Sequence, residues 1–228
     1  MKSIEYIKKI FPYTSPVLAG YVFLGIAFGM LMRSAGFAFI YPVLMSVFIY
    51  SGALEYAAIP LLAAEFAPLN ALFMGIMISI RHLFYGIPML KKYSGIGKIK
   101  PFLIFGLTDE TFSILAVTDT PEGIPDRSFY TIVTALNYFY WNLGTAIGSA
   151  IGGIADFSSY GLDFSLTALF IVLFLEQLKD RTGRISGFAG IVVSILVLIF
   201  AGSGSFVLFA MLGILVVLLG GRKVLDRE

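Results

Sequence analysis

Long stretches without a charged residue constrain this chain more than any other feature. Such runs cover residues 10–32, 34–54, 66–80, 128–155 and 185–221. A helix crosses a bilayer core of roughly 30 Å with about 20 apolar residues, so most of these runs are long enough to span it. Hydrophobic residues make up 58% of the chain and charged residues 13%. The pattern therefore predicts an all-α polytopic membrane protein.

The runs leave no room for a soluble domain, so residues 1–228 are predicted to form a single integral membrane domain. Its core covers 12–180. A C-terminal hairpin follows at 185–221, because this last run is too long for one helix and contains small residues at 202–205. The chain has no cysteine, which excludes disulfides and thiolate metal sites. It also lacks a phosphate-binding loop, a histidine pair and a basic nucleic-acid tract, so no metal, cofactor or nucleic acid is expected.

Lysines predict the orientation in the bilayer. Four of them fall in the loop 91–100, which the positive-inside rule places in the cytoplasm. Eight full crossings would put both termini inside but this loop outside. If the stretch 41–64 is re-entrant, the loop returns to the cytoplasm, and a second re-entrant or broken element within 128–162 also brings the basic loop 179–184 inside. The rule favours about six crossings with two irregular elements over eight, with both termini cytoplasmic.

The stretch 41–64 contains a small-residue break followed by a carboxylate. Ser51 and Gly52 interrupt the apolar sequence, and Glu55 is the one charged residue between 34 and 64. Irregular backbone at membrane depth is tolerated only where it lines a cavity or is buried in protein. Two half-helices with a site beside them therefore fit better than one kinked helix. An ionisable group at this depth indicates function, because burying it is expensive.

Other polar residues fall at membrane depth in the segments 68–90 and 101–117. Arg81 and Tyr85 are four residues apart and share a helix face. A structural ion pair is the alternative to a functional role for Glu55, Arg81 and Asp109. Trp141 is expected either in an interfacial aromatic belt or in the wall of an apolar pocket. The candidate substrate- or proton-binding residues are Ser51, Gly52, Glu55, Arg81, Tyr85, Asp109, Glu110, Asn137 and Trp141.

Glycines spaced by four residues predict close helix packing. Gly25 and Gly29 form one such pair, and Gly144, Gly148 and Gly152 form a longer row. Small residues at this spacing let two helices approach closely. The two rows either pack on one another or receive a second protein, and their number favours a partner subunit.

Several short pieces of sequence, taken in order, carry a family resemblance. They are residues 25–29, 46–58, 81–85, 107–110, 138–141, 144–148 and 161–164. Over about residues 12–180 the chain resembles the AzlC family of branched-chain amino acid exporters. Members of that family work with a small second membrane subunit, AzlD, so the resemblance implies such a partner and the export of leucine, isoleucine and valine. Glu55 stands where the family pattern has glutamine, and Ser79 where asparagine is common, which affects the expected substrate.

The residues are compatible with an aliphatic amino-acid substrate. Half-helix N-termini suit its carboxylate, Glu55 or Asp109 suits its ammonium group, and Trp141 with nearby Phe and Leu side chains suits its side chain. The same carboxylates can carry a coupling proton. We therefore expect a proton-coupled exporter in the inner (plasma) membrane rather than an enzyme. The alternatives are an intramembrane enzyme using His82 with Glu55 or Glu110, and a channel-like or scaffolding membrane protein.

Overall fold

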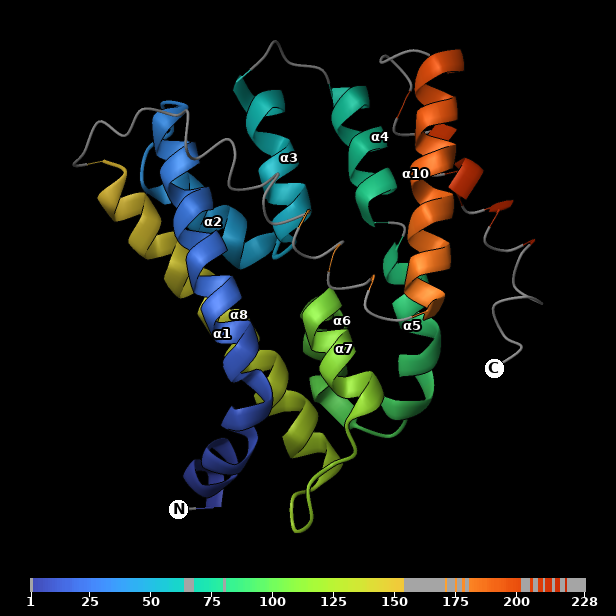
Figure 1. Ribbon diagram of the computed structural model, residues 1–228. Coiled ribbons are helices and arrows are strands. Elements are labelled where there is room, and N and C mark those ends of the chain that lie inside the picture. Colours follow the sequence, from blue (N-terminus) through green and yellow to red (C-terminus); the bar gives the residue numbers. More distant parts are fainter. Residues whose placement is uncertain are drawn as a thin grey trace. The chain divides into compact units, whose positions relative to one another are not determined.

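The computed structural model describes residues 2–63, 68–79, 81–153 and 181–201, together with 171, 175, 178, 206, 209–210, 212–214, 216–217 and 220. The regular structure in these ranges is helical, with no strand (Figure 1). The chain divides into two compact units, Met1–Ser165 and Leu166–Glu228, and each is described here by itself. The single domain predicted over 1–228 stays a prediction.

Two long helices form the frame of the first unit. α1 (Lys2–Ser34) has 33 residues and α8 (Asp126–Ile151) has 26. At about 1.5 Å per residue, both exceed the bilayer core of roughly 30 Å, and α1 is also apolar enough to cross it. The two helices begin at the same end, where the rings of Tyr13 and Phe129 lie 6.1 Å apart. They finish together as well, since a Cβ at Gly152 would lie 2.9 Å from the Cβ of Arg33. They therefore run parallel, side by side (Figure 1).

Glycines bring the backbones of α1 and α8 into contact. A Cβ at Gly25 would lie 2.8 Å from both Thr145 N and Trp141 O, and one at Gly144 would lie 2.6 Å from Val22 O. Such distances leave no room for a side chain. The glycines in this contact are Gly25 and Gly29 of α1, Gly144 and Gly148 of α8, and Gly152 at the C-cap of α8. The two rows thus pack on one another, which is the first of the two alternatives, and they give no support for a separate partner. The partner subunit itself stays a prediction.

The chain after α1 folds into two half-helices. α2 (Ile40–Phe48) and α3 (Gly52–Ala63) are separated by Ile49, Tyr50 and Ser51. α2 starts beside the end of α8, where Ser149 Oγ donates to Phe39 O at 3.0 Å. It ends at mid-height on α8, where the Tyr138 hydroxyl donates to Val47 O at 2.9 Å. α3 then runs back toward the end at which α2 began (Figure 1), which confirms the predicted broken element.

Four shorter helices, α4 to α7, complete the description of this unit, and α6 and α7 form a second pair of half-helices. α4 (Pro68–Ser79) and α5 (Arg81–Lys92) lie on either side of residue 80, which is outside the described residues. A 3-10 turn, η1 (Gly97–Ile99), leads into α6 (Lys100–Phe105) and then α7 (Asp109–Val117). The break at 106–108 interrupts a segment expected to be one helix.

The second irregular element lies before α8, not within it. α8 is continuous from Asp126 to Ile151, so the prediction of a broken or re-entrant element in that part of 128–162 is wrong. Residues 154–162 lie outside the described residues. The second break falls at Thr108 instead, because Thr108 caps α7 by accepting a hydrogen bond from Thr111 N at 3.3 Å. Asp109 and Glu110 in the first turn add favourable charge at this helix N-terminus.

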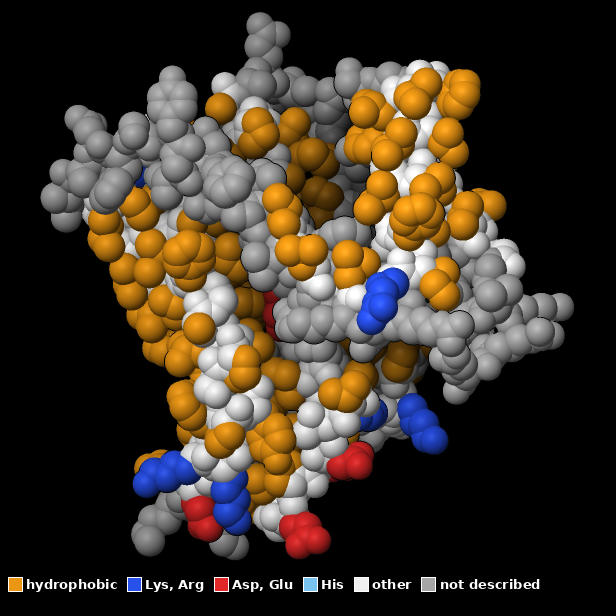
Figure 2. All heavy atoms as spheres, in the orientation of Figure 1, with side chains coloured by type: hydrophobic (Ala, Val, Ile, Leu, Met, Phe, Trp, Pro, Cys, Tyr) orange, Lys and Arg blue, Asp and Glu red, His pale blue; other side chains and the backbone are white. Residues whose placement is uncertain are grey.

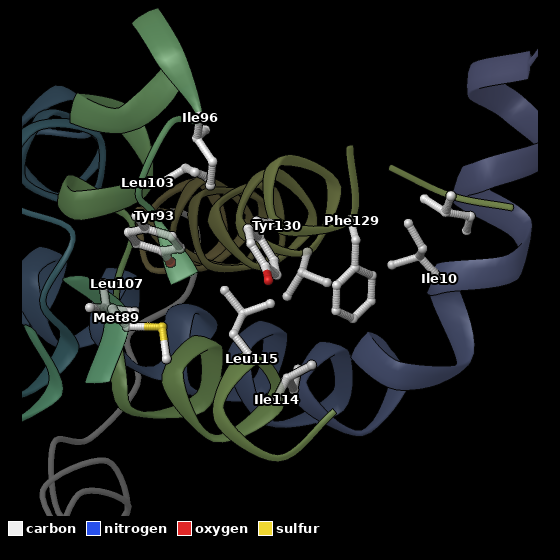
Figure 3. Packing of buried hydrophobic residues seen from close by; sticks show 12 residues of the cluster. Ile10, Met89, Tyr93, Ile96, Leu103, Leu107, Ile114, Leu115, Phe129 and Tyr130 are labelled. Carbon is white, nitrogen blue, oxygen red and sulfur yellow. The ribbon is translucent and has the colours of Figure 1, made fainter. Parts of the chain in front are cut away.

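A hydrophobic cluster marks the end of the unit where the N-terminus lies (Figure 3). It joins Ile10 of α1 to Tyr93 and Ile96, and also to Ile124 and Phe129 around the start of α8. Nearby, the Lys92 ammonium donates to the carbonyl oxygens of residues 115 and 116 at the end of α7. The loops after α5 and after α7 therefore lie at the same end as the start of α1. Figure 2 shows charged side chains gathered at this end and apolar side chains above them on α1 and α8.

The second unit contains the first arm of the predicted C-terminal hairpin. α10 (Arg181–Ala201) is followed by helical residues between 206 and 220. A Cβ at Gly213 would lie 2.8 Å from Val193 Cγ1, so the second arm packs on α10. The expected turn at 202–205 lies outside the described residues.

Candidate functional site

The two breaks meet in the middle of the first unit. The Tyr50 ring lies 5.9 Å from the Phe105 ring and 4.8 Å from the Tyr138 ring. Tyr21 of α1 reaches the second break, and its ring lies 5.6 Å from that of Trp141. The N-termini of α3 and α7 therefore open toward the same region, where free N–H groups and the helix dipoles concentrate polar chemistry.

Glu55 is fully buried, with 0% of its surface exposed, and N–H groups hold its carboxylate. The backbone N–H of Ser51 donates to Oε1 at 3.0 Å. Trp141 Nε1 lies 3.2 Å from Oε1 and 3.1 Å from Oε2, and donates to this carboxylate. No side chain within the described ranges forms an ion pair with Glu55. The side chain of Arg81 lies outside the described residues, so the suggested Arg81–carboxylate pair remains a prediction.

Trp141 forms part of an apolar wall beside Glu55. It is 4% exposed, which excludes an interfacial belt and leaves the pocket-wall alternative. Its ring stacks with that of Phe28 at 6.4 Å, and Phe28 in turn lies 5.5 Å from the Tyr56 ring. A Cβ at Gly52 would lie 2.9 Å from Trp141 Cη2. The glycine at the start of α3 therefore allows Trp141 to approach closely enough to reach Glu55.

A chain of hydrogen bonds links Glu110 to Asn137 on the other side of Trp141. The Tyr21 hydroxyl lies 2.6 Å from Glu110 Oε2 and 2.7 Å from Thr108 Oγ1. The hydroxyls of Thr108 and Thr111 are 3.0 Å apart, and Asn137 Nδ2 donates to Thr111 Oγ1 at 3.0 Å. These hydrogen bonds thus connect α1, α7 and α8 through uncharged side chains, and they end at the Glu110 carboxylate.

Two donors meet at the Thr111 hydroxyl, because Thr108 Oγ1 and Asn137 Nδ2 both donate to it. The Tyr21 hydroxyl has one proton to donate, and Glu110 Oε2 and Thr108 Oγ1 both lie within its reach. Asn137 donates into the start of the chain, and its Oδ1 is buried without a hydrogen bond to a described residue.

The remaining predicted residues lie around this region. Asp109 is the first residue of α7 and half-buried. Tyr85 stacks on Phe112 of α7, with ring centroids 4.8 Å apart, and packs against the hydrophobic cluster. Arg81 is the first residue of α5. The structure thus brings together Ser51, Gly52, Glu55 and Trp141 as one group, and Glu110 with Asn137 as another.

Sequence reasoning missed Tyr21, Tyr50, Thr108 and Thr111. Tyrosine and threonine within apolar runs carry no charge and give no signal of depth or proximity. Thr108 alone had a usable signal, since a threonine directly before two acidic residues is typical of a helix N-cap.

Comparisons with known proteins give matches along most of the chain. A family model, described as AzlC protein, matches residues 16–155. The branched-chain amino acid transport protein AzlC of Bacillus subtilis (strain 168) is 46% identical over 220 residues, which are 96% of this chain and 87% of that protein. An uncharacterized membrane protein of Haemophilus influenzae is 39% identical over 216 residues, covering 94% and 88% of the two chains.

The inner membrane protein YgaZ of Escherichia coli is 29% identical over 175 residues, which are 73% of this chain and 71% of that protein. No solved structure matches. These similar proteins are named as membrane proteins, and the described residues are helical. The predicted class of helical membrane protein is confirmed.

Proposed function

The chain belongs to the AzlC family, and from this premise we propose that it is the larger subunit of a proton-coupled exporter of branched-chain amino acids. The observation that carries the proposal is the match with a branched-chain amino acid transport protein over 96% of the chain. A small AzlD-like membrane protein is the proposed partner, in the inner (plasma) membrane.

The site geometry supports a transporter. Secondary transporters bind substrates near the bilayer midplane, where broken helices supply half-helix ends. Here two such breaks meet beside the packed pair α1 and α8, and an aromatic wall of Phe28, Tyr56 and Trp141 adjoins them. This wall suits an aliphatic side chain. Glu55 and Asp109 are proposed to handle the substrate or the coupling proton.

The alternative of an intramembrane enzyme would depend on His82, the only histidine in the sequence. The described contacts of His82 are with Ser79 O at 3.0 Å and with the Tyr85 ring at 5.8 Å. Neither contact is to a carboxylate that could form a catalytic pair with it. These contacts favour the transporter over the enzyme.

Efflux of labelled amino acids tests the proposed function. Cells loaded with labelled valine or leucine should lose it faster when they express this chain with a neighbouring small membrane protein than when they carry an empty vector. A cell line with this chain alone tests the need for the partner. Equal efflux in all lines, across several amino acids, would remove the exporter proposal, and hydrolytic activity lost on His82→Ala would favour the enzyme.

The proposed topology of the first unit has three crossings and two re-entrant pairs. α1, the α4–α5 segment and α8 cross, whereas α2–α3 and α6–α7 enter from opposite ends and return. The loop 91–100 lies at the same end of the unit as the hydrophobic cluster and the start of α1. Its four lysines favour a cytoplasmic position for this end. The N-terminus and the loop 118–125 are then cytoplasmic as well, and the loop 35–39 is external.

Single cysteines report this topology cleanly, because the chain has none of its own. Ser94, Glu122 and Ala38 are exposed and lie in three different loops. We expect an impermeant thiol reagent added outside intact cells to label Ala38→Cys only. After the cells are opened, all three variants should react. External labelling of Ser94→Cys would overturn the re-entrant model and favour eight crossings.

A further inference from the structure

We propose that a groove along α6 binds one anionic phospholipid, with its headgroup at Lys98 and Lys100 and an acyl chain on the apolar side of the groove. This inference goes beyond the proposed function and does not depend on the substrate. The groove has a volume of about 900 Å³ and lies on the surface of the first unit. It is lined by Gly97, Lys98, Lys100, Pro101, Ile104 and Phe105.

The two lysines give the groove a positive charge that no described acid neutralises. None of the lining residues is acidic. Neither Lys98 nor Lys100 forms an ion pair with an acidic side chain in the described ranges. Lys92, which lies nearby in the sequence, is engaged instead with carbonyl oxygens at the end of α7. The two groove lysines are therefore available to a bound anion.

Along α6, one face continues from the lysines to exposed apolar side chains. Lys100 and Ile104 are four residues apart and so lie on one side of the helix. Pro101 and Phe105 form a second such pair. Ile104 is 57% exposed and Phe105 is 42% exposed. At about 1.5 Å per residue, Ile104 lies roughly 6 Å further along the helix than Lys100. A ligand that fills the groove therefore needs an anionic end next to an apolar chain.

The position of the groove in the unit fits a phospholipid. The loop that carries Lys98 lies at the same end as the start of α1, because Ile96 and Ile10 belong to one hydrophobic cluster. Charged side chains gather at this end (Figure 2). From there α6 runs toward the breaks, where the Phe105 ring lies 5.9 Å from the Tyr50 ring. The lysines therefore lie at the level of lipid headgroups, and the apolar face lies at the level of acyl chains.

An anionic phospholipid matches both sides of this groove. Each lysine near an anionic membrane surface contributes roughly fivefold in affinity. A zwitterionic lipid carries its own cation, which the lysines repel, and a free phosphate would leave the apolar face uncovered. A bound acyl chain would contact Phe105, whose ring packs on those of Tyr50 and Tyr138. We therefore expect the lipid to stabilise the fold around the breaks.

Lipid-dependent thermal unfolding tests the proposal. Delipidated protein in mild detergent is titrated with dioleoylphosphatidylglycerol, which is anionic, and with dioleoylphosphatidylcholine, which is zwitterionic. Glycerol 3-phosphate supplies the headgroup anion without acyl chains. Phosphatidylglycerol should raise the Tm saturably, because a ligand that binds only the folded state stabilises it. An equal rise with phosphatidylcholine or with glycerol 3-phosphate would overturn the proposal.

Two pairs of lysines provide matched variants. The double variant Lys98→Gln with Lys100→Gln removes the two groove charges. The control, Lys8→Gln with Lys91→Gln, removes two exposed charges at the same end that do not line the groove. The groove variant should raise the apparent Kd for phosphatidylglycerol about 25-fold, and the control should change it by less than about twofold. The Kd is taken from the lipid-dependent rise in Tm, so a lower starting Tm in either variant does not affect the comparison.

Three results would contradict the proposed lipid site. An unchanged Kd in the groove variant would mean that Lys98 and Lys100 do not hold the headgroup. An equal loss of affinity in the two double variants would mean that the lipid responds to the general surface charge and not to the groove. The third test titrates the protein co-purified with the proposed small membrane subunit. Stabilisation by phosphatidylglycerol should persist there, and its loss would show that a protein covers the groove.

Discussion

Replacing Gly148 with alanine is expected to prevent α1 and α8 from packing, and so to deplete the folded protein. A Cβ at Gly148 would collide with the backbone of Ile26, closer than the 2.6 Å separating a Cβ at Gly144 from Val22 O. Side-chain rotation cannot relieve a clash with backbone. Overpacking costs about 1–3 kcal/mol in ordinary cores, and a backbone clash at the centre of the main helix pair should reach at least the upper value.

Gly20→Ala is the matched control. Gly20 lies in α1, the other helix of the pair, but a Cβ added there would have no contact within 4 Å. Both variants are compared by the yield of monodisperse protein in mild detergent and by thermal unfolding. Gly148→Ala should lose most of that yield, and Gly20→Ala should retain it with an unchanged Tm. Equal yields and Tm values would mean that the glycine contact between α1 and α8 does not hold the unit together.

Transport should fall at least tenfold in Glu55→Gln and further in Asp109→Asn, while both proteins remain inserted and folded. Glutamine has the size of Glu55, and its one oxygen can still accept from Ser51 N and Trp141 Nε1. It loses the negative charge and the titratable proton, and it places an NH₂ donor where Oε2 accepts from Trp141 Nε1. Asp109 lies in the first turn of α7 at the second break. Since the resemblance to the AzlC family implies glutamine at position 55, Glu55→Gln is expected to be the milder change.

The efflux assay with labelled valine, repeated at several external pH values, measures both effects. Glu5→Gln is a suitable control, because Glu5 is exposed and its pairing with Lys9 at 3.9 Å is open to solvent, where such pairs contribute little. Wild-type transport with unchanged pH dependence in both acid variants would remove Glu55 and Asp109 from the mechanism.

The outline of the fold could be predicted from sequence because segments that cross a membrane are long and have no charged residues. The charge-free runs at 10–32 and 128–155 correspond to α1 and α8. Ser51 and Gly52 followed by Glu55 indicated the first break, since small residues and a buried acid have few other uses at that depth. The charge-free runs and the break before Glu55 can both be recognised within one short stretch of sequence, without knowledge of tertiary contacts.

Features that depend on tertiary contacts could not be predicted in the same way. The segment 101–117 was expected to be one helix with polar residues in its middle. In the structure Thr108 is the N-cap of α7, so a new helix begins there. The glycine rows were assigned in part to a partner because spacing does not say which helix faces which. Likewise, the contact between Glu55 and Trp141 joins residues 86 positions apart. No periodicity reports such a pairing.

Fluorescence of Trp141 tests the central claim most directly, that the substrate binds where the two breaks meet. Trp141 is the only tryptophan in the chain, and its indole N–H contacts Glu55 inside the proposed site. Titrating purified protein with valine, leucine or isoleucine should change its emission saturably, with a midpoint equal to the Kd for labelled valine, and lysine should have no effect. Saturable binding of labelled valine with unchanged Trp141 emission would place the substrate elsewhere and contradict this account.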